Sequence, residues 1–212
     1  MVFPETPIFA IRREPILSAE GSVFTANEIR IVSLYSQGYD EAEISVKMGK
    51  ALGHIRNMVA SRNGKSIKEK INQMTGWSPN NIDEITIWMY GKQMIPGVVP
   101  MTQFYTEELY SNIQIQALTL VASGISTTKD IANELHHRDG STKNIISDAI
   151  ITTETFTGLR THRIGAAMTM VALGYIDEGV IGSRLPAESW QKPQSTENPL
   201  EVAPSLPVAS LS

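Results

Sequence analysis

The feature that most constrains this chain is a short helix–glycine–helix pattern that starts at Phe24 and returns in the second half of the sequence. Thr25 and Glu28 have the spacing of a capping box, in which each side chain satisfies a backbone amide at the start of a helix. Apolar residues then follow at the three-to-four spacing of a buried helical stripe, and Gly38 is placed to end the helix. The sequence therefore predicts a first helix with a defined start and stop.

Two further helices are expected directly after that glycine. The first should run from Glu41 to Met48, and the second should begin near Gly53 and carry the polar residues His54, Arg56 and Asn57. Two short helices across a tight turn, the second of them basic, are typical of a helix-turn-helix DNA-binding unit.

The second copy has the same internal distances. Tyr110 precedes Gly124 by as many positions as Phe24 precedes Gly38, and Leu135 follows Ile131 as Met48 follows Ile44. A repeat this long predicts two domains in one chain and not a solenoid of short units.

These stretches resemble the LuxR-type, or GerE-type, helix-turn-helix domain, which begins Leu-Thr-x-x-Glu-x-x-Val-Leu-x-Leu. The distances from Phe24 to Gly38 and on to Ile44 match that family, and Ile55-Arg56-Asn57 falls on its Val-Lys-Asn. In the second copy, Thr142-Lys143-Asn144 falls on the same Val-Lys-Asn. The family's closing helix falls on residues 82–95 and again on residues 163–176, and that helix can make the dimer contact in the family.

The resemblance implies an all-α protein with two tandem four-helix LuxR-like domains, at residues 24–95 and 105–176. The first copy is longer than the family usually is, and we place its extra residues at about 63–77. We expect residues 1–23 to form an extended N-terminal arm with little structure of its own, and residues 96–104 to form a short, stiff linker bracketed by prolines. Residues 177–212 are acidic and rich in Pro and Ser, so we expect a disordered tail whose removal from Leu185 onward leaves the fold intact.

The charge of the chain is unevenly distributed. The formal net charge is −4, which is unusual for a nucleic-acid-binding protein. Residues 47–70 nevertheless hold seven basic residues and one acidic residue, whereas basic and acidic residues balance over 129–163. Salt screens charges beyond about 8 Å, so the local patch governs a phosphate contact. The second copy is therefore expected to be the poorer DNA binder, or a packing or partner module.

One register in the second copy is left open by the sequence. Thr142 stands where the family buries a Val, so the buried position could instead be Ile145. The sequence also leaves open the role of the N-terminal arm, which could dock on the domain or contact DNA through Arg12 and Arg13.

Several kinds of chemistry are not predicted. The chain has no cysteine, and Gly64-Lys65-Ser66 lacks the earlier glycine of a phosphate-binding loop because Val59 stands there. The pair His136-His137 lacks the partners of a metal site, and no nucleophile motif is visible. We therefore expect no enzyme activity, cofactor or metal. With neither a secretory signal nor a membrane-length apolar run in view, we expect a cytoplasmic protein.

The function predicted from these patterns is sequence-specific binding of double-stranded DNA, and hence transcriptional regulation. Expected partners besides DNA are a second copy of the chain or RNA polymerase, and no membrane. The first alternative is a protein-interaction adaptor that keeps the fold without reading bases, and the second is a docking subunit of a nucleic-acid-processing complex. The predicted DNA-binding residues are His54, Arg56, Asn57, Arg62, Lys65, Lys68, Ser141, Lys143 and Asn144.

Overall fold

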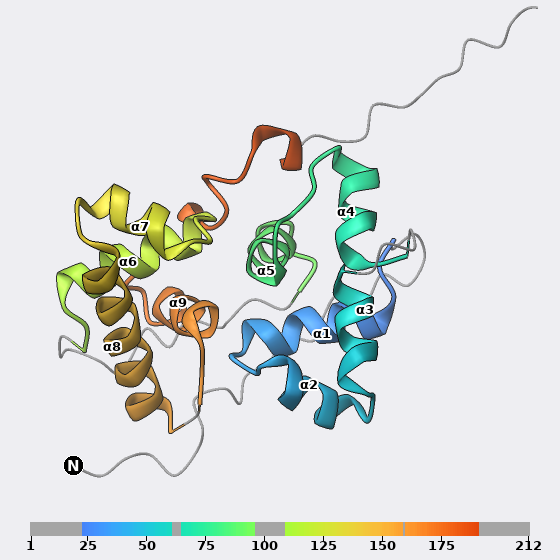
Figure 1. Ribbon diagram of the computed structural model, residues 1–212, viewed down its shortest axis with the longest axis horizontal. Coiled ribbons are helices and arrows are strands. Elements are labelled where there is room, and N and C mark those ends of the chain that lie inside the picture. The colour runs from blue at the N-terminus through green and yellow to red at the C-terminus, as the bar shows by residue number, and fades with distance from the viewer. Residues whose placement is uncertain (1–22, 61–64, 96–108, 159, 191–212) are drawn as a thin grey trace, which may run out of the picture.

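The computed structural model describes residues 23–60, 65–95, 109–158 and 160–190, and every regular element within these ranges is a helix (Figure 1). This confirms the all-α class. None of the described helices is both long enough and apolar enough to cross a membrane. In chain order the elements are α1 (Ala26–Ser36), α2 (Glu41–Met48), α3 (Leu52–Ala60), α4 (Ile67–Thr75), α5 (Ile82–Gly91), α6 (Asn112–Ser123), α7 (Thr128–Leu135), α8 (Asp139–Thr157), α9 (Arg163–Ala172) and the 3-10 helices η1 (Glu178–Val180) and η2 (Ala187–Trp190).

The first region, α1 to α5, begins as the sequence predicts. Thr25 and Glu28 form the capping box at α1, and Gly38 adopts a left-handed conformation just beyond its end. Asp40 and Glu43 form a second capping box at α2. Side chains from all five helices fill one core, which includes Ile31, Val32, Ile44, Ile55, Ile67, Ile71 and Trp88.

The first region contains five helices, whereas we predicted four. The additional helix is α4, which lies where the sequence placed the extra residues. Ser66 caps it by accepting a hydrogen bond from the backbone of Glu69, and Ile67 and Ile71 point into the core. The insertion is therefore a packed helix, because its apolar residues recur at helical spacing and it has its own cap.

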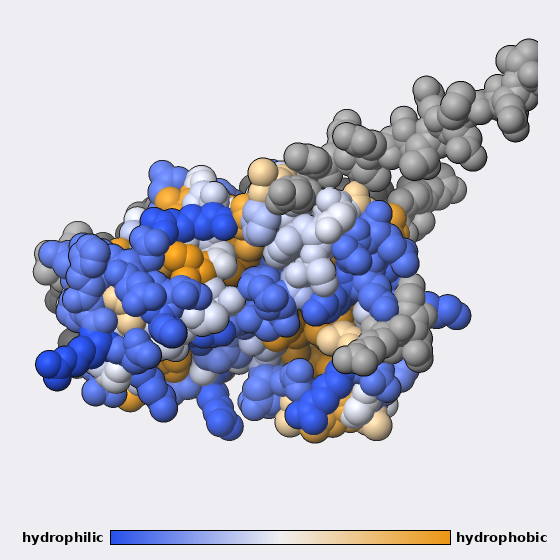
Figure 2. Space-filling view, turned by 45° about the horizontal axis from the view of Figure 1, so that its top comes forward, coloured by the Kyte–Doolittle hydropathy of each residue, from blue (hydrophilic) through white to orange (hydrophobic). Residues whose placement is uncertain are grey.

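The second region, α6 to α9, repeats the order of the first with one change. Its third helix, α8, runs unbroken for 19 residues, where the first region has α3 and α4 in succession. The turn before α8 also differs, because His136 takes the left-handed conformation that Gly49 takes before α3. The face of the molecule in Figure 2 is mainly hydrophilic, with separate smaller hydrophobic areas.

Residues 177–190, which we call the C-terminal strap, are folded, and this corrects the predicted start of the disordered tail. Ile181 and Leu185 are buried in the core. The backbone amides of Gly182 and Arg184 donate to the last carbonyls of α6, at 2.9 and 2.8 Å. The acidic and proline-rich average of the whole C-terminal segment conceals the few apolar residues that anchor the strap.

The strap also covers the first region. The Trp88 indole Nε1 on α5 donates to the Ser189 carbonyl at 2.6 Å, and Lys92 Nζ donates to the Trp190 carbonyl at 3.2 Å. The Trp190 ring lies so close to Gly91 that a Cβ there would come within 2.7 Å of it. A cut at Leu185 would remove these contacts, so the structure leads us to expect that such a truncation destabilises the fold, contrary to the prediction from the sequence. The predicted linker and nearly all of the predicted arm lie outside the described residues.

Candidate nucleic-acid interface

Helix α3 separates buried from exposed residues along its length. Ile55 and Val59, four residues apart, are buried in the core. The predicted DNA-binding residues His54, Arg56 and Asn57 are all exposed on the same helix. The structure thus brings these three side chains together on one solvent-facing helix, as the sequence predicted.

Arg56 already has an acidic partner on the neighbouring helix α2. Its Nε donates to Glu41 Oε2 at 2.8 Å, and the Arg56 side chain is 63% exposed. An exposed pair of this kind contributes about 0–1 kcal/mol, so another acceptor can replace Glu41 at small cost. The guanidinium also carries further N–H donors on its terminal nitrogens.

The basic run that follows α3 is less uniform than its sequence indicates. Lys65 is exposed just before α4, and Lys68 is half-buried in its first turn. Arg62 lies outside the described residues. Lys70, by contrast, forms an ion pair with the buried Glu28 carboxylate at 2.7 Å. Lys70 therefore belongs to the internal packing of α1 against α4 and is not part of a surface patch.

Helix α8 presents the matching residues of the second region. Ser141, Lys143 and Asn144 are exposed, and Thr142 and Ile146 are buried as Ile55 and Val59 are in α3. This settles the open register: Thr142 is 0% exposed, whereas Ile145 is only half-buried.

The buried Thr142 is nevertheless a poorer core residue than Ile55. Its hydroxyl has no hydrogen-bond partner within the part of the chain that the structure describes. A buried hydroxyl without a partner keeps its desolvation cost, about 1–3 kcal/mol. The second region therefore gives up stability at the position where the first region packs a methyl-rich side chain.

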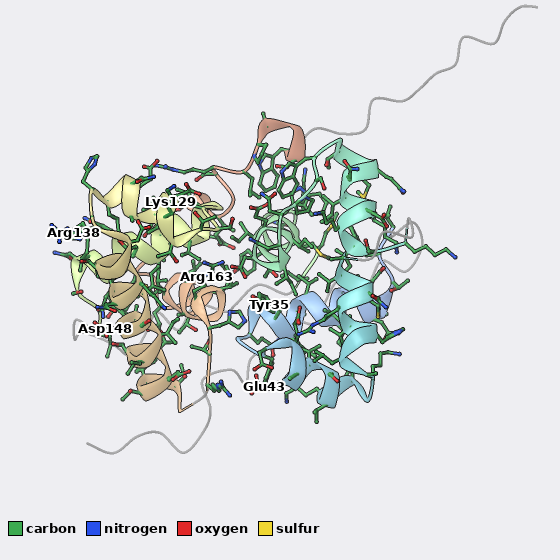
Figure 3. The ribbon with its side chains drawn as sticks, in the orientation of Figure 1. Tyr35, Glu43, Lys129, Arg138, Asp148 and Arg163 are labelled. Carbon is green, nitrogen blue, oxygen red and sulfur yellow. The ribbon has the colours of Figure 1, made fainter. Side chains whose placement is uncertain are left out.

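Charges of both signs surround α8. Figure 3 shows Arg138 and Asp148 on the outer side of the second region, and Arg138 directly precedes the helix that begins at Asp139. His136 and His137 lie exposed in the turn before it. Across the described residues, no group of three or more His, Asp or Glu side chains is placed to hold a metal ion.

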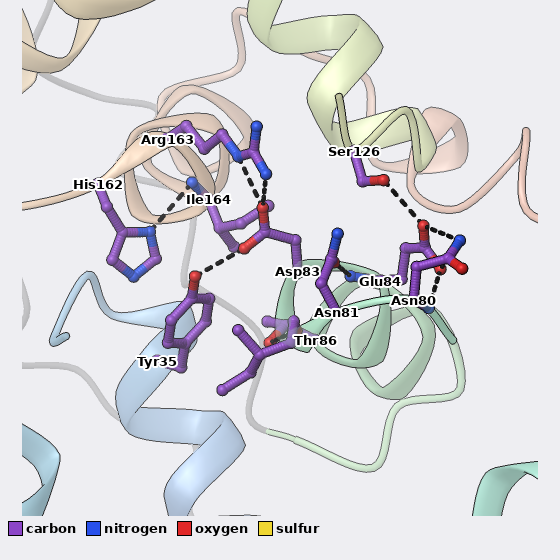
Figure 4. A network of polar contacts seen from close by, with 11 residues as sticks. Tyr35, Asn80, Asn81, Asp83, Glu84, Thr86, Ser126, His162, Arg163 and Ile164 are labelled. Atoms are coloured by element: carbon purple, nitrogen blue, oxygen red, sulfur yellow. Dashed lines mark hydrogen bonds and ion pairs between the residues drawn. The ribbon is translucent and has the colours of Figure 1, made fainter. Parts of the chain in front are cut away.

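A polar cluster between the two regions was not predicted from the sequence (Figure 4). Asp83, in the first turn of α5, accepts hydrogen bonds from Tyr35 Oη and Arg163 Nε, both at 2.6 Å. The Tyr35 ring also lies 4.2 Å, centroid to centroid, from the ring of His162, which caps α9 through Nδ1. We call Tyr35, Asp83, His162 and Arg163 the junction cluster.

Burial dominates the electrostatics of the junction cluster. It raises the pKa of Tyr35, and the Asp83 carboxylate raises it further. Burial also lowers the pKa of His162, with Arg163 acting in the same sense and Asp83 opposing it. His162 is therefore favoured in its neutral form, which leaves Nδ1 free to accept the Ile164 amide.

The comparisons with known proteins give no match: no protein-family model, no curated protein and no solved structure is similar to this chain. The helices alone define the class, which is an all-α protein with two similar helical regions within the described residues. The LuxR-type resemblance remains a prediction from the sequence.

Proposed function

We propose that this protein is a transcriptional regulator that binds double-stranded DNA sequence-specifically through tandem LuxR-like helix-turn-helix domains at residues 24–95 and 105–176. One observation carries the proposal. Helices α3 and α8 bury equivalent residues, Ile55 and Thr142, and thereby expose Arg56-Asn57 and Lys143-Asn144 at equivalent positions. We call α3 and α8 the candidate recognition helices.

The exposed side chains have the chemistry that base readout requires. Arg pairs with the O6 and N7 atoms of guanine, and Asn pairs with the N6 and N7 atoms of adenine in the major groove. Arg56 and Asn57 are assigned these roles in the first domain, with His54 beside them. Lys65, Lys68 and Arg62 would contact phosphates, which orient the protein without reading sequence. Ser141, Lys143 and Asn144 hold the corresponding positions in the second domain.

In this mechanism Glu41 competes with guanine for the Arg56 guanidinium. In the free protein Glu41 holds the Arg56 guanidinium at 2.8 Å, and guanine would replace it in the complex. A carboxylate beside the base-reading Arg also repels phosphates that arrive in the wrong register, which adds to discrimination. A second copy of the chain, or RNA polymerase, is a further partner of this regulator.

The experiment compares Arg56→Ala with Lys68→Ala on DNA selected by the protein from randomised duplexes. Loss of Arg56 should weaken the selected site by about 1–3 kcal/mol and relax its sequence preference. Loss of Lys68 should weaken selected and random DNA alike and reduce the salt slope by about one. Arg160→Ala, which removes an exposed cation outside the candidate recognition helices, is the matched control.

Equal effects of Arg56→Ala and Lys68→Ala on selected and random DNA would refute base readout by α3. Binding that does not change with salt would refute the phosphate contacts, because counterion release should lower log K by about 0.9 per contact for each unit of log salt.

The adaptor alternative rests on a separate observation. The chain carries a net charge of −4, and α8 exposes acidic residues such as Asp148 beside its predicted DNA-binding residues. A protein that selects no DNA in the experiment above would favour this alternative.

A further inference from the structure

Each region contacts the other through the same pair of elements. The loop after α1 packs on the first turn of α9, where a Cβ on Gly165 would lie 2.7 Å from the Cα of Gly38. The loop after α6 packs on the first turn of α5, where Ser126 Oγ donates to Glu84 Oε1 at 2.8 Å. Glu84 and Gly165 occupy the same place in the first turns of α5 and α9. The two contacts use corresponding loops and helices, although Gly124, the counterpart of Gly38, packs against Leu185 of the strap and not against α5. The interface is therefore reciprocal at the level of its elements, as in an approximate dimer.

The arrangement of the helices agrees with this reciprocity. In Figure 1, α5 and α9 are seen nearly end-on at the centre, while α3 and α8 lie at opposite ends of the molecule. Helix α3 runs upward in that view and α8 runs downward. An approximate two-fold axis between α5 and α9 would exchange the two candidate recognition helices.

Buried contacts hold the two regions in this relation. The Asp83 carboxylate of the first region binds the Arg163 guanidinium of the second region, and the Asp83 side chain is only 5% exposed. The strap adds a second attachment, since it bonds to the last turn of α6 and to Trp88 of α5. Two attachments on separate elements prevent the regions from turning freely about a single hinge.

From these observations we infer that one chain is a built-in pseudo-dimer, whose DNA target is two different half-sites in inverted orientation at one fixed separation. The inference rests on the proposed function. Inversion follows because an approximate two-fold axis in the protein is mirrored in the site that it reads. The half-sites differ because His54, Arg56 and Asn57 face one of them and Ser141, Lys143 and Asn144 face the other.

The separation of the half-sites follows from the shape of DNA and the fixed junction. Both candidate recognition helices must meet one side of the duplex, so their centres should lie about 10–10.5 base pairs apart, or a multiple of that. A flexibly tethered pair of domains would accept several separations. A pair of domains fixed by the junction cluster and the strap accepts only one separation between the half-sites.

The test starts from duplexes that the full-length protein selects from a randomised pool. Two different motifs in inverted order at a single spacing, bound by one chain per duplex, are expected. Inserting either about 5 or about 10 base pairs between the motifs, roughly half a turn and a full turn, should lower affinity at least roughly tenfold, to that of the stronger half-site alone.

Variants identify which helix reads which half. The double variant Lys143→Ala/Asn144→Ala should bind the intact site at least roughly tenfold more weakly than the unmodified protein does, as the insertion does. On the site with the insertion, the double variant should bind almost as tightly as the unmodified protein. Both residues are exposed, so the fold should persist, and Arg160→Ala is the control for loss of a cation from the second region.

The outcomes separate the inference from the function on which it rests. A single selected motif whose binding depends on Arg56 but not on Lys143 or Asn144 overturns the pseudo-dimer and leaves DNA binding standing. Motifs in direct orientation, or tolerance of the 10-base-pair insertion, overturn it as well. A protein that selects no motif overturns both.

Discussion

In the first region the candidate recognition helix α3 has nine residues and is followed by a separate helix, whereas α8 of the second region continues for 19 residues. The continuation of α8 is anchored, because Thr153 shares a buried hydrogen bond of 3.0 Å with the Tyr110 hydroxyl. The first region instead adds α4, whose Ile67 and Ile71 enlarge the core, with Lys65 just before its cap and Lys68 in its first turn. The first region has the richer cationic chemistry, and the second has the more firmly supported helix.

The contrast runs the other way where each candidate recognition helix meets its core. Ile55 fills its site with carbon, while Thr142 buries an unpartnered hydroxyl among the described residues. Ahead of these helices, Gly49 takes a left-handed conformation that favours glycine, and His136 takes it with a side chain. The same order of helices therefore forms in both regions although the second carries a buried unpartnered hydroxyl and a left-handed residue with a side chain. The shared feature is that equivalent positions are buried.

The largest expected effect comes from removing the strap, which belongs to both regions. Deleting residues 177–212 should lower the free energy of unfolding by roughly 3–6 kcal/mol, because Ile181 and Leu185 each contribute about 1.5–3 kcal/mol by burial. Chemical denaturation followed by tryptophan fluorescence and by circular dichroism measures it.

Those two probes also test whether the regions then unfold apart. The three tryptophans, at positions 77, 88 and 190, report only on the first region and the strap. The fluorescence and circular-dichroism transitions should separate in the deletion variant and coincide in the full chain. The control lacks only residues 191–212 and retains all contacts described above; equal stability of the two variants would refute the role of the strap.

Breaking the junction cluster should cost somewhat less. Asp83→Ala removes the acceptor shared by Tyr35 and Arg163. Breaking a fully buried ion pair costs about 3–5 kcal/mol, and the 28% exposure of the Arg163 side chain places the expected cost at the lower end of that range. Tyr35→Phe should cost only about 1 kcal/mol, because Asp83 keeps its pair with Arg163. Denaturant midpoints of both variants measure the difference. If Asp83→Ala costs no more than Asp148→Ala, which removes an exposed acid from α8, the cluster does not join the regions.

Exchanging the two buried positions sharpens the comparison directly. Thr142→Val keeps the shape and removes the unpartnered hydroxyl, so it should raise the free energy of unfolding by about 1 kcal/mol. Ile55→Thr introduces the same defect into the first region and should lower it by roughly 2–3 kcal/mol. The control is Thr155→Val, at an exposed position of α8. A gain from Thr155→Val as large as that from Thr142→Val would assign the effect to helix propensity.

The smallest effect near neutral pH should come from His162. Its pKa in the folded chain lies below the ordinary value of 6.5, so the unfolded chain binds the extra proton first as the pH falls. Stability should therefore decline as the pH falls below about 6.5, at no more than about 1.36 kcal/mol per pH unit, and level off below the folded pKa. His162→Asn keeps a capping oxygen and should flatten this part of the pH profile. An unchanged profile in that variant would assign the decline to another group.

Sequence reasoning found the elements whose signals are local. The Thr25–Glu28 capping box, the bounds of α2 and the exposed residues of α3 follow from the spacing of nearby residues, and all are present in the structure. The junction cluster did not follow, because it pairs Asp83 with Arg163 across 80 positions and depends on how the two regions dock. Lys70 was assigned to the basic patch for the same reason, since only the fold brings it to Glu28. The strap was missed because its average composition conceals Ile181 and Leu185.

The strap also has a consequence for how the chain matures during synthesis. The Trp88 indole finds its hydrogen-bond acceptor at Ser189, 101 residues later in the chain. At about 5–20 residues per second, the ribosome needs roughly 5–20 s after making Trp88 to supply that partner. Until then the α5 surface that Trp190 covers stays open, so the first region completes its core last although it is translated first. A nascent or prematurely terminated chain would thus display an unfinished α5 surface, which marks it for chaperones or proteases.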